Sequence, residues 1–106
     1  VGAAPAWQPK NIKNGGSVTS VSFMNTTEES FHADSTATPA GFQVVLPGSP
    51  TVRQRHTVTN TGTANLVTVN GNTKNIIGPG YSALTFVLGV RESLTVEYDG
   101  GAWTII

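Results

Sequence analysis

The feature that most constrains the fold is the stretch that ends the chain. Leu94, Val96 and Tyr98 alternate with polar residues, which is the period of a strand with one buried face. Asp-Gly-Gly at 99–101 follows, and glycine takes positive φ at little steric cost, so a tight turn is expected there. Residues 103–106 then supply a second strand of aromatic and β-branched residues. The stretch predicts a β-hairpin that closes the fold with the last residue of the chain.

Similar strand patterns occur upstream, whereas no segment has a convincing helical period. The expected strands lie within residues 17–24, 42–46, 52–60, 65–69, 76–77 and 82–88. Turn residues separate them, including Asn70-Gly71, which between alternating segments is a strong hairpin signal. Because the strands do not recur at a fixed period, the pattern predicts no solenoid. We therefore expect an all-β fold, an antiparallel β-sandwich or jelly roll.

The length of the chain and the positions of its prolines and glycines predict one domain preceded by an extended arm. The chain has 106 residues, enough for a single domain with its own core. Residues 1–16 contain two prolines and a glycine pair without sustained periodicity, so we expect an extended N-terminal arm there. Because the sequence begins with Val1 rather than methionine, we expect the arm to continue from a longer chain. Residues 17–106 form the expected single β-sandwich domain.

The low content of charged residues argues against some classes of binding partner. Six basic and six acidic residues cancel, and 11% of residues are charged, which argues against nucleic-acid binding because that requires a basic patch. No apolar run approaches the length of a membrane span, and without cysteine no thiolate site or disulfide can form. Two explanations of the low charge remain: partner subunits cover part of the surface, or abundant Ser, Thr and Asn keep the domain soluble.

The turns and strands of the second half carry a resemblance. The matching segments are Asn60-Thr61-Gly62-Thr63-Ala64-Asn65-Leu66-Val67-Thr68-Val69-Asn70-Gly71, Ile76-Ile77-Gly78, Ser93-Leu94-Thr95-Val96-Glu97-Tyr98-Asp99-Gly100 and Trp103-Thr104-Ile105-Ile106. Together they resemble the ends of bacteriophage tail fibres, tailspikes and tail needles. The resemblance implies a homotrimeric antiparallel β-sandwich or jelly-roll-like knob, of the TNF/C1q-like kind, at the distal tip of the virion tail.

Two functions follow as expectations. The resemblance implies a non-enzymatic tail tip, a needle knob or fibre tip, that attaches to or probes a glycan or protein on the host cell surface. The alternative is a carbohydrate-binding or adhesion module of a secreted bacterial protein, which could use the same sandwich. A fibre tip should be an obligate trimer, whereas a binding module is usually monomeric.

No catalytic or cofactor motif is predicted. Gly80-Tyr81-Ser82-Ala83-Leu84 lacks the second glycine of a nucleophile elbow, and no phosphate-cradling glycine motif occurs. Carboxylates and imidazoles gather at Glu28, Glu29, His32 and Asp34, which are residue types that bind metal ions. Their spacing matches neither a zinc pair nor a calcium loop, so we expect a solvated loop or edge strand with Phe31 pointing inward.

One candidate ligand site remains, formed by Arg53, Arg55 and His56. Two arginines two residues apart share one face of a strand, and each guanidinium can bind a carboxylate through two hydrogen bonds. We expect a small anionic ligand there, at a boundary between subunits, with His56 joining from an adjacent face or subunit. The alternative is that the arginines pair with acidic side chains at the surface, namely Glu28, Glu29 or Glu97.

Overall fold

The computed structural model describes residues 12–16, 21–36 and 41–106, and within them every regular element is a β-strand. The strands are β1 (Ile12–Gly16), β2 (Val21–Phe23), β3 (Ser30–Asp34), β4 (Phe42–Val45), β5 (Arg55–Asn60), β6 (Val67–Asn70), β7 (Ile76–Gly78), β8 (Tyr81–Ala83), β9 (Thr85–Leu88), β10 (Ser93–Tyr98) and β11 (Trp103–Ile105). In this part of the chain no helix is long and apolar enough to cross a membrane. The expectation of an all-β fold is confirmed.

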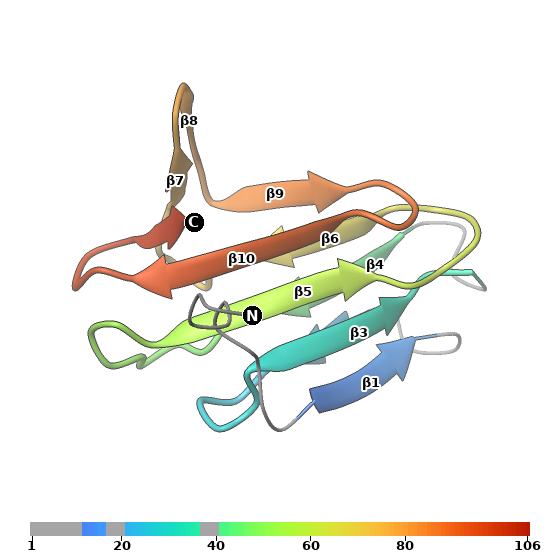
Figure 1. Ribbon diagram of the computed structural model, residues 1–106, viewed down its shortest axis with the longest axis horizontal. Helices are drawn as coiled ribbons and strands as arrows, with labels where there is room; N and C mark the ends of the chain where they lie inside the picture. Colours follow the sequence, from blue (N-terminus) through green and yellow to red (C-terminus); the bar gives the residue numbers. More distant parts are fainter. Residues whose placement is uncertain (1–11, 17–20, 37–40) are drawn as a thin grey trace, which may run out of the picture.

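The strands form two sheets that face each other (Figure 1). The long sheet has seven strands in the order β1-β3-β5-β10-β11-β7-β8, and the short sheet has four in the order β2-β4-β6-β9. From β1 to β6 the chain alternates between the sheets, and each strand runs parallel to the one before it in its own sheet. The first six strands are therefore stacked coils of a short β-solenoid.

This coiling corrects the expectation of an antiparallel sandwich or jelly roll and of no solenoid. Parallel neighbours need a crossover between them, and here the crossover is a strand of the opposite sheet. The coils differ in length: Ile12 pairs with Ser30, and Ser30 in turn pairs with Thr57. Because the loops vary, the sequence has no fixed period, although the strands stack regularly.

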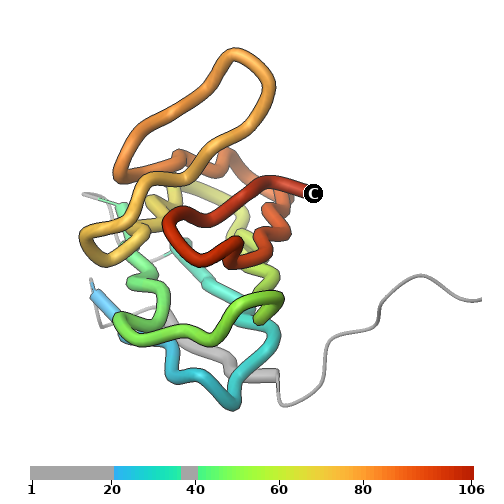
Figure 2. The backbone as a smooth tube through the Cα atoms, turned by 90° about the vertical axis from the view of Figure 1, so that its left-hand side faces the viewer, coloured from blue at the N-terminus to red at the C-terminus, as the bar shows by residue number. Residues whose placement is uncertain are grey.

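The chain reverses direction in its last third, residues 76–106, which we call the cap. β9 pairs antiparallel with β6 and β10 pairs antiparallel with β5, so each sheet of the coil receives one reversed strand. The β7–β8 hairpin projects from the body beside the C-terminus (Figures 1 and 2). The predicted closing hairpin is confirmed, because β10 and β11 pair across the turn and the Ile106 amide donates to the Thr95 carbonyl at 3.0 Å.

The core lies between the two sheets and extends into the cap. Its fully covered members include Phe31, Phe42, Val44, Leu46, Val58, Val67, Val69, Ile76, Leu88, Val96 and Trp103. Phe31 and Phe42, from opposite sheets, meet with ring centroids 6.1 Å apart. Trp103 contacts the rings of His56 and Tyr98, at centroid distances of 5.5 and 5.4 Å. The cap is therefore packed into the same core as the coils.

The largest differences between the expected and the observed strand boundaries are three. The expected arm, residues 1–16, ends in β1, which pairs with β3, while residues 1–11 lie outside the described residues. The expected strand 52–60 begins at Arg55, since residues 51–54 form a turn. The expected strand 82–88 is divided at Leu84, where the chain passes from the long sheet to the short sheet.

Candidate functional site

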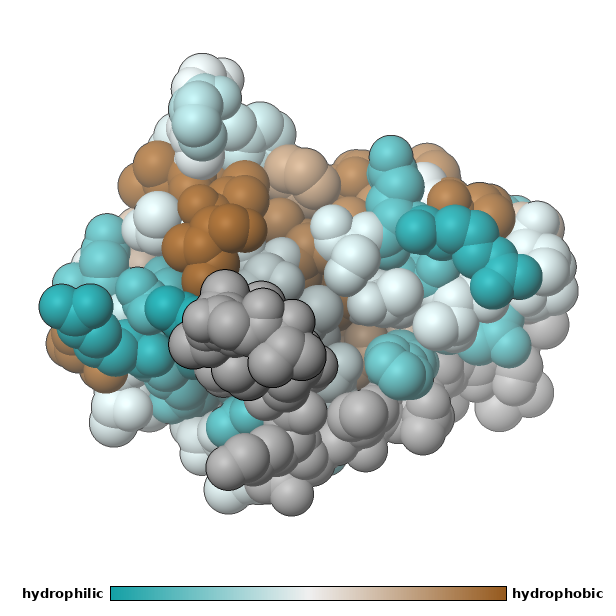
Figure 3. Space-filling view, viewed as in Figure 1, coloured by the Kyte–Doolittle hydropathy of each residue, from teal (hydrophilic) through white to brown (hydrophobic). Residues whose placement is uncertain are grey.

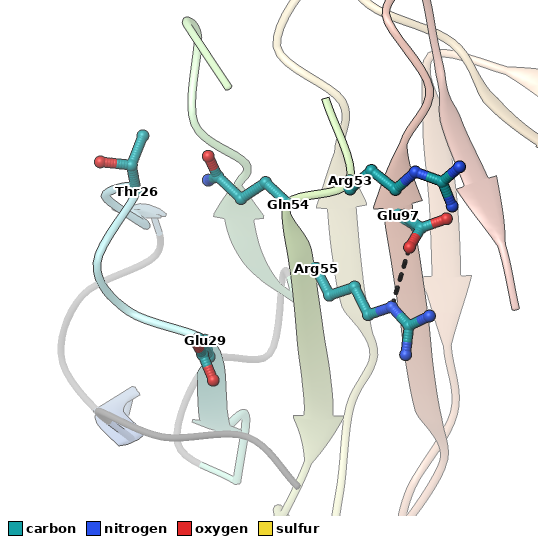
Figure 4. Close-up of a pocket in the computed structure, with 6 residues that line it drawn as sticks. All are labelled: Thr26, Glu29, Arg53, Gln54, Arg55 and Glu97. Carbon is teal, nitrogen blue, oxygen red and sulfur yellow. Dashed lines mark hydrogen bonds and ion pairs between the residues drawn. The ribbon is translucent and has the colours of Figure 1, made fainter. Parts of the chain in front are cut away.

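An open cavity of about 400 Å³ lies where the turn before β5 meets the end of β10. It is lined by Thr26, Glu29, Arg53, Gln54, Arg55 and Glu97 (Figure 4). Thr26 and Glu29 belong to the loop between β2 and β3, the next three residues to the turn and first residue of β5, and Glu97 to β10. Polar side chains from three separate segments thus meet at one surface.

The turn that carries Arg53 is fixed by hydrogen bonds on both sides. The Gln54 amide donates to the Thr51 carbonyl at 3.0 Å, and the Gln54 side-chain oxygen accepts from the Thr51 amide at 3.1 Å. The Arg53 amide donates to the Tyr98 carbonyl at 2.8 Å, which ties the turn to β10. Arg53 has φ of 75°, a conformation that costs energy for a side chain of this size and persists only where its surroundings hold it.

Arg55 is the second cation of the cavity and is already paired. It lies opposite Glu97 in the β5–β10 register, and its Nε donates to the Glu97 carboxylate at 2.9 Å (Figure 4). Both side chains are partly exposed, so this ion pair is worth only about 0–1 kcal/mol. The prediction that an arginine pairs with Glu97 is confirmed for Arg55.

The structure brings Arg53 and Arg55 together, but not for the reason given by the sequence. Both line the cavity, yet Arg53 lies in the turn rather than on a shared strand face. Its guanidinium makes no ion pair with any residue in the described part of the chain. The sequence reasoning missed Thr26 and Gln54 as lining residues, because loop conformation and strand register decide their positions.

His56 does not belong to the cavity, which corrects the predicted site. It lies on the opposite face of β5 from Arg55, is fully buried and packs edge-on against Trp103. Since the Gln54 oxygen accepts from Thr51, the Gln54 side-chain nitrogen is the donor to His56 Nε2, at 2.6 Å. His56 Nδ1 then carries the proton and donates to the Glu28 carbonyl at 2.6 Å. The buried imidazole thus links the turn before β5, through Gln54, to the loop before β3, through Glu28.

His56 makes stability depend on pH. Burial lowers its pKa below the ordinary value of 6.5, although the hydrogen bond to Glu28 and the carboxylates of Glu29 and Glu28 act in the opposite direction. The folded chain therefore binds this proton less readily than the unfolded chain. The contribution of neutral, buried His56 to the free energy of unfolding is fully present above pH 6.5 and is lost as the pH falls below that value.

We expect the free energy of unfolding to decrease from pH 7 to pH 5, by at most about 1.4 kcal/mol per pH unit for one proton. Denaturant titrations at several pH values measure this decrease. His56→Asn is the matched variant, because its side-chain amide can still donate to Glu28 but does not titrate. An equal pH dependence in the variant would show that His56 is not the responsible group.

The cluster of acidic residues and histidine is a structural segment. His32 and Asp34 lie on β3, which has neighbours on both sides and is not an edge strand, and Phe31 points inward as expected. Hydrogen bonds from the Thr36 side chain and backbone lower the pKa of the exposed Asp34. Among residues 12–16, 21–36 and 41–106, no group of three or more His, Cys, Asp or Glu residues is placed to hold a metal ion.

Two residues of the segments that carry the resemblance, Asn60 and Asp99, stabilise the fold through side-chain hydrogen bonds. The buried Asn60 side chain accepts from the Gly62 amide at 2.9 Å and the Ser35 hydroxyl at 3.0 Å, which joins two coils. Asp99 accepts from the amides of Gly101 and Ala102, and these hydrogen bonds lower its pKa and close the β10–β11 turn. These two residues of the resembling segments therefore have a structural role: they hold the last coil and the turns of the cap in place.

Comparison with known proteins adds no assignment. No protein-family model matches the chain, and no curated protein matches it with significance.

Proposed function

We propose that this chain is the non-enzymatic tip domain of a bacteriophage tail fibre or tail needle, which acts as a homotrimer and contacts the host cell surface. The observation that carries the proposal is the cap. It contains three of the four segments that resemble fibre ends, it terminates a stack of coils, and it exposes apolar side chains.

The apolar surface of the cap supports the trimer. Leu84, Val87 and Val90 follow one another along β9 and its flanking loops, and each is 43–52% exposed. A cavity of about 420 Å³ lies beside them, between β9 and the start of β10, and is lined by Phe86, Val87, Leu88, Glu92 and Ser93. In Figure 3, apolar surface follows the side of the molecule that carries the cap. Exposed apolar side chains that lie close together along one strand and its loops are the kind of surface that subunit contacts would cover.

The hydrogen bonds and ion pairs of the polar side chains support a role in attachment rather than in catalysis. Both ring nitrogens of the buried His56 are taken by hydrogen bonds within the fold, and Glu97 is bound by Arg55. Asn60 and Asp99 fasten turns. The polar residues described here thus build the surface or hold the fold, which suits a domain that binds and supports.

We expect light scattering of the purified chain at micromolar concentration to give three times the mass of one chain. Val87→Lys should convert the trimer to monomers, because a charge would be buried at the contact. Leu66→Lys is the matched control: Leu66 is equally exposed, at 52%, but precedes β6, outside the cap. A monomeric parent protein would refute the tail-tip proposal and favour the carbohydrate-binding or adhesion module.

A further inference from the structure

The side chains of Gln54 and His56 form a chain of hydrogen bonds between two backbone groups of fixed polarity. At one end the Glu28 carbonyl can only accept, so His56 Nδ1 donates to it at 2.6 Å. At the other end the Thr51 amide can only donate, so the Gln54 oxygen accepts from it at 3.1 Å. The central bond of 2.6 Å must then run from the Gln54 nitrogen to His56 Nε2. The chain of hydrogen bonds therefore requires a neutral imidazole.

A protonated His56 cannot be accommodated by rotating a side chain. Both ring nitrogens of an imidazolium donate, so His56 Nε2 would face the N–H group of Gln54. Turning the Gln54 amide over would give the ring an acceptor but would place a donor against the Thr51 amide. The Thr51 hydroxyl, 3.3 Å from the Gln54 oxygen, can reverse its role, whereas the backbone amide cannot. The added proton thus removes one hydrogen bond of the chain.

The hydrogen bond that is lost holds the turn of residues 51–54. This turn contains Arg53 with φ of 75°, a backbone conformation that persists only where its surroundings hold it. Thr51, Val52 and Arg53 are exposed, so packing contributes little to keeping the turn closed. His56, in contrast, is fully buried against Trp103. The turn is therefore the part of this arrangement that gives way.

The groups around the imidazole come from the loop before β3, from β10 and from β11, and are Glu28, Glu29, Val96, Tyr98 and Trp103. Burial lowers the pKa of His56, and this effect outweighs the hydrogen bond to the Glu28 carbonyl and the two carboxylates, which raise it. The ion pair between β5 and β10 lies on the other face of the long sheet. The closed turn thus surrounds a ring that resists protonation.

We propose that residues 51–54 form a pH-sensitive turn, which is closed while His56 is neutral and opens when the ring takes up a proton. In the open turn Nε2 reaches water, so the open form binds the proton more readily and a falling pH favours it. One coupled proton shifts this equilibrium by at most about tenfold per pH unit below the ordinary pKa of about 6.5. Because Arg53 and Gln54 line the cavity in Figure 4, the shape of that surface then depends on pH.

Native-state hydrogen exchange of the full chain from pH 7 to pH 5, followed by nuclear magnetic resonance, tests the proposal. The Thr51 amide is the reporter, because its acceptor is the Gln54 side chain. After correction for intrinsic exchange, its protection should fall by up to about tenfold per pH unit below about pH 6.5. Little dependence on denaturant would identify a local opening, whereas Val69, buried in β6, should exchange through global unfolding. A Thr51 amide that stays protected until the whole chain unfolds would refute the proposal.

The decisive variant is Gln54→Glu, which should reverse the effect. A carboxylate only accepts, so the introduced group can accept from the Thr51 amide and from a protonated His56 at the same time. We expect the pKa of His56, measured from its ring resonances, to rise above about 6.5 in this variant. The Thr51 amide should then keep its protection at pH 5. A variant that loses protection on acidification as the parent protein does would overturn the proposal, since a purely packing role for Gln54 predicts no reversal.

His56→Asn and His32→Asn form a matched pair, because the chain has two histidines. The first should abolish the pH dependence of Thr51 exchange, and the second should keep it, since His32 lies on the outer face of β3 beside Thr59. The opposite pattern would assign the effect to another group. The mass measurement is independent of this inference: a monomer with a pH-sensitive turn would refute only the tail tip, and a trimer with a pH-insensitive turn only the present proposal.

Discussion

Removal of residues 103–106 is expected to abolish cooperative folding. The deletion takes away β11, which lies between β10 and β7 in the long sheet, and with it the fully buried Trp103. The β7–β8 hairpin would lose its only strand partner in the described part of that sheet. Truncation of a large core side chain alone costs about 3–5 kcal/mol, against about 5–15 kcal/mol for a whole domain.

Thermal and denaturant unfolding, followed by circular dichroism, would measure the effect. Trp103→Phe is the graded control, because it keeps an aromatic ring in the core and removes the hydrogen bond from the indole nitrogen to the Gly71 carbonyl, which is 3.1 Å long. We expect this variant to fold with reduced stability. A truncated protein that melts cooperatively near the parent temperature would show that the cap is not integral to the fold.

Gly71→Ala is expected to have the second largest effect. A methyl group at Gly71 would lie 1.9 Å from the Lys74 carbonyl oxygen and 3.4 Å from that of Leu84. Both are backbone atoms, so the clash can be relieved only by moving the turn that joins β6 to β7. The same turn supplies the carbonyl that accepts from Trp103. The loss should reach or exceed the upper end of the 1–3 kcal/mol typical of overpacking, about 3 kcal/mol.

Gly101→Ala is the matched control for this substitution. A methyl group there would meet only the Asp99 carboxylate, at 3.9 Å, and Gly101 is exposed. Equilibrium unfolding should place Gly101→Ala within about 0.5 kcal/mol of the parent protein. Equal stability of the two variants would mean that the β6–β7 turn adjusts without cost.

The sequence was informative where the determining contacts are local. The β10–β11 hairpin follows from alternation and an Asp-Gly-Gly turn, which are properties of adjacent residues. Inward-facing side chains such as Phe42, Val44 and Val96 follow from the period of two, whatever the strand beside them.

Strand pairing could not be predicted in the same way. An antiparallel sandwich and a two-sheeted solenoid both expose one face of each sheet, so both produce alternating strands. β5 alternates buried and partly exposed residues although β3 beside it is parallel and β10 is antiparallel. The direction of a neighbour depends on how the loops return the chain, and loops of unequal length left no repeat to detect.

The candidate site shows the same limit. Arginine chemistry was visible in the sequence, and both Arg53 and Arg55 do border a cavity. The burial of His56 was not visible, because β5 contains polar residues on both faces and only the packing of Trp103 reveals which face is inside. Glu97 becomes a cavity residue through the register between β10 and β5, which no local pattern encodes.

The reversal of the chain at the cap also bears on how such proteins diversify. The cap joins the coils through one strand in each sheet, β10 on β5 and β9 on β6. Whole coils could therefore be gained or lost upstream by recombination without altering the junction, as in other proteins built from stacked units. Under the proposed function, caps could be exchanged between fibres. Sequence similarity between two such proteins would then begin only at the coil on which the cap is built. Residue 60, where the resemblance begins, is the last residue of β5.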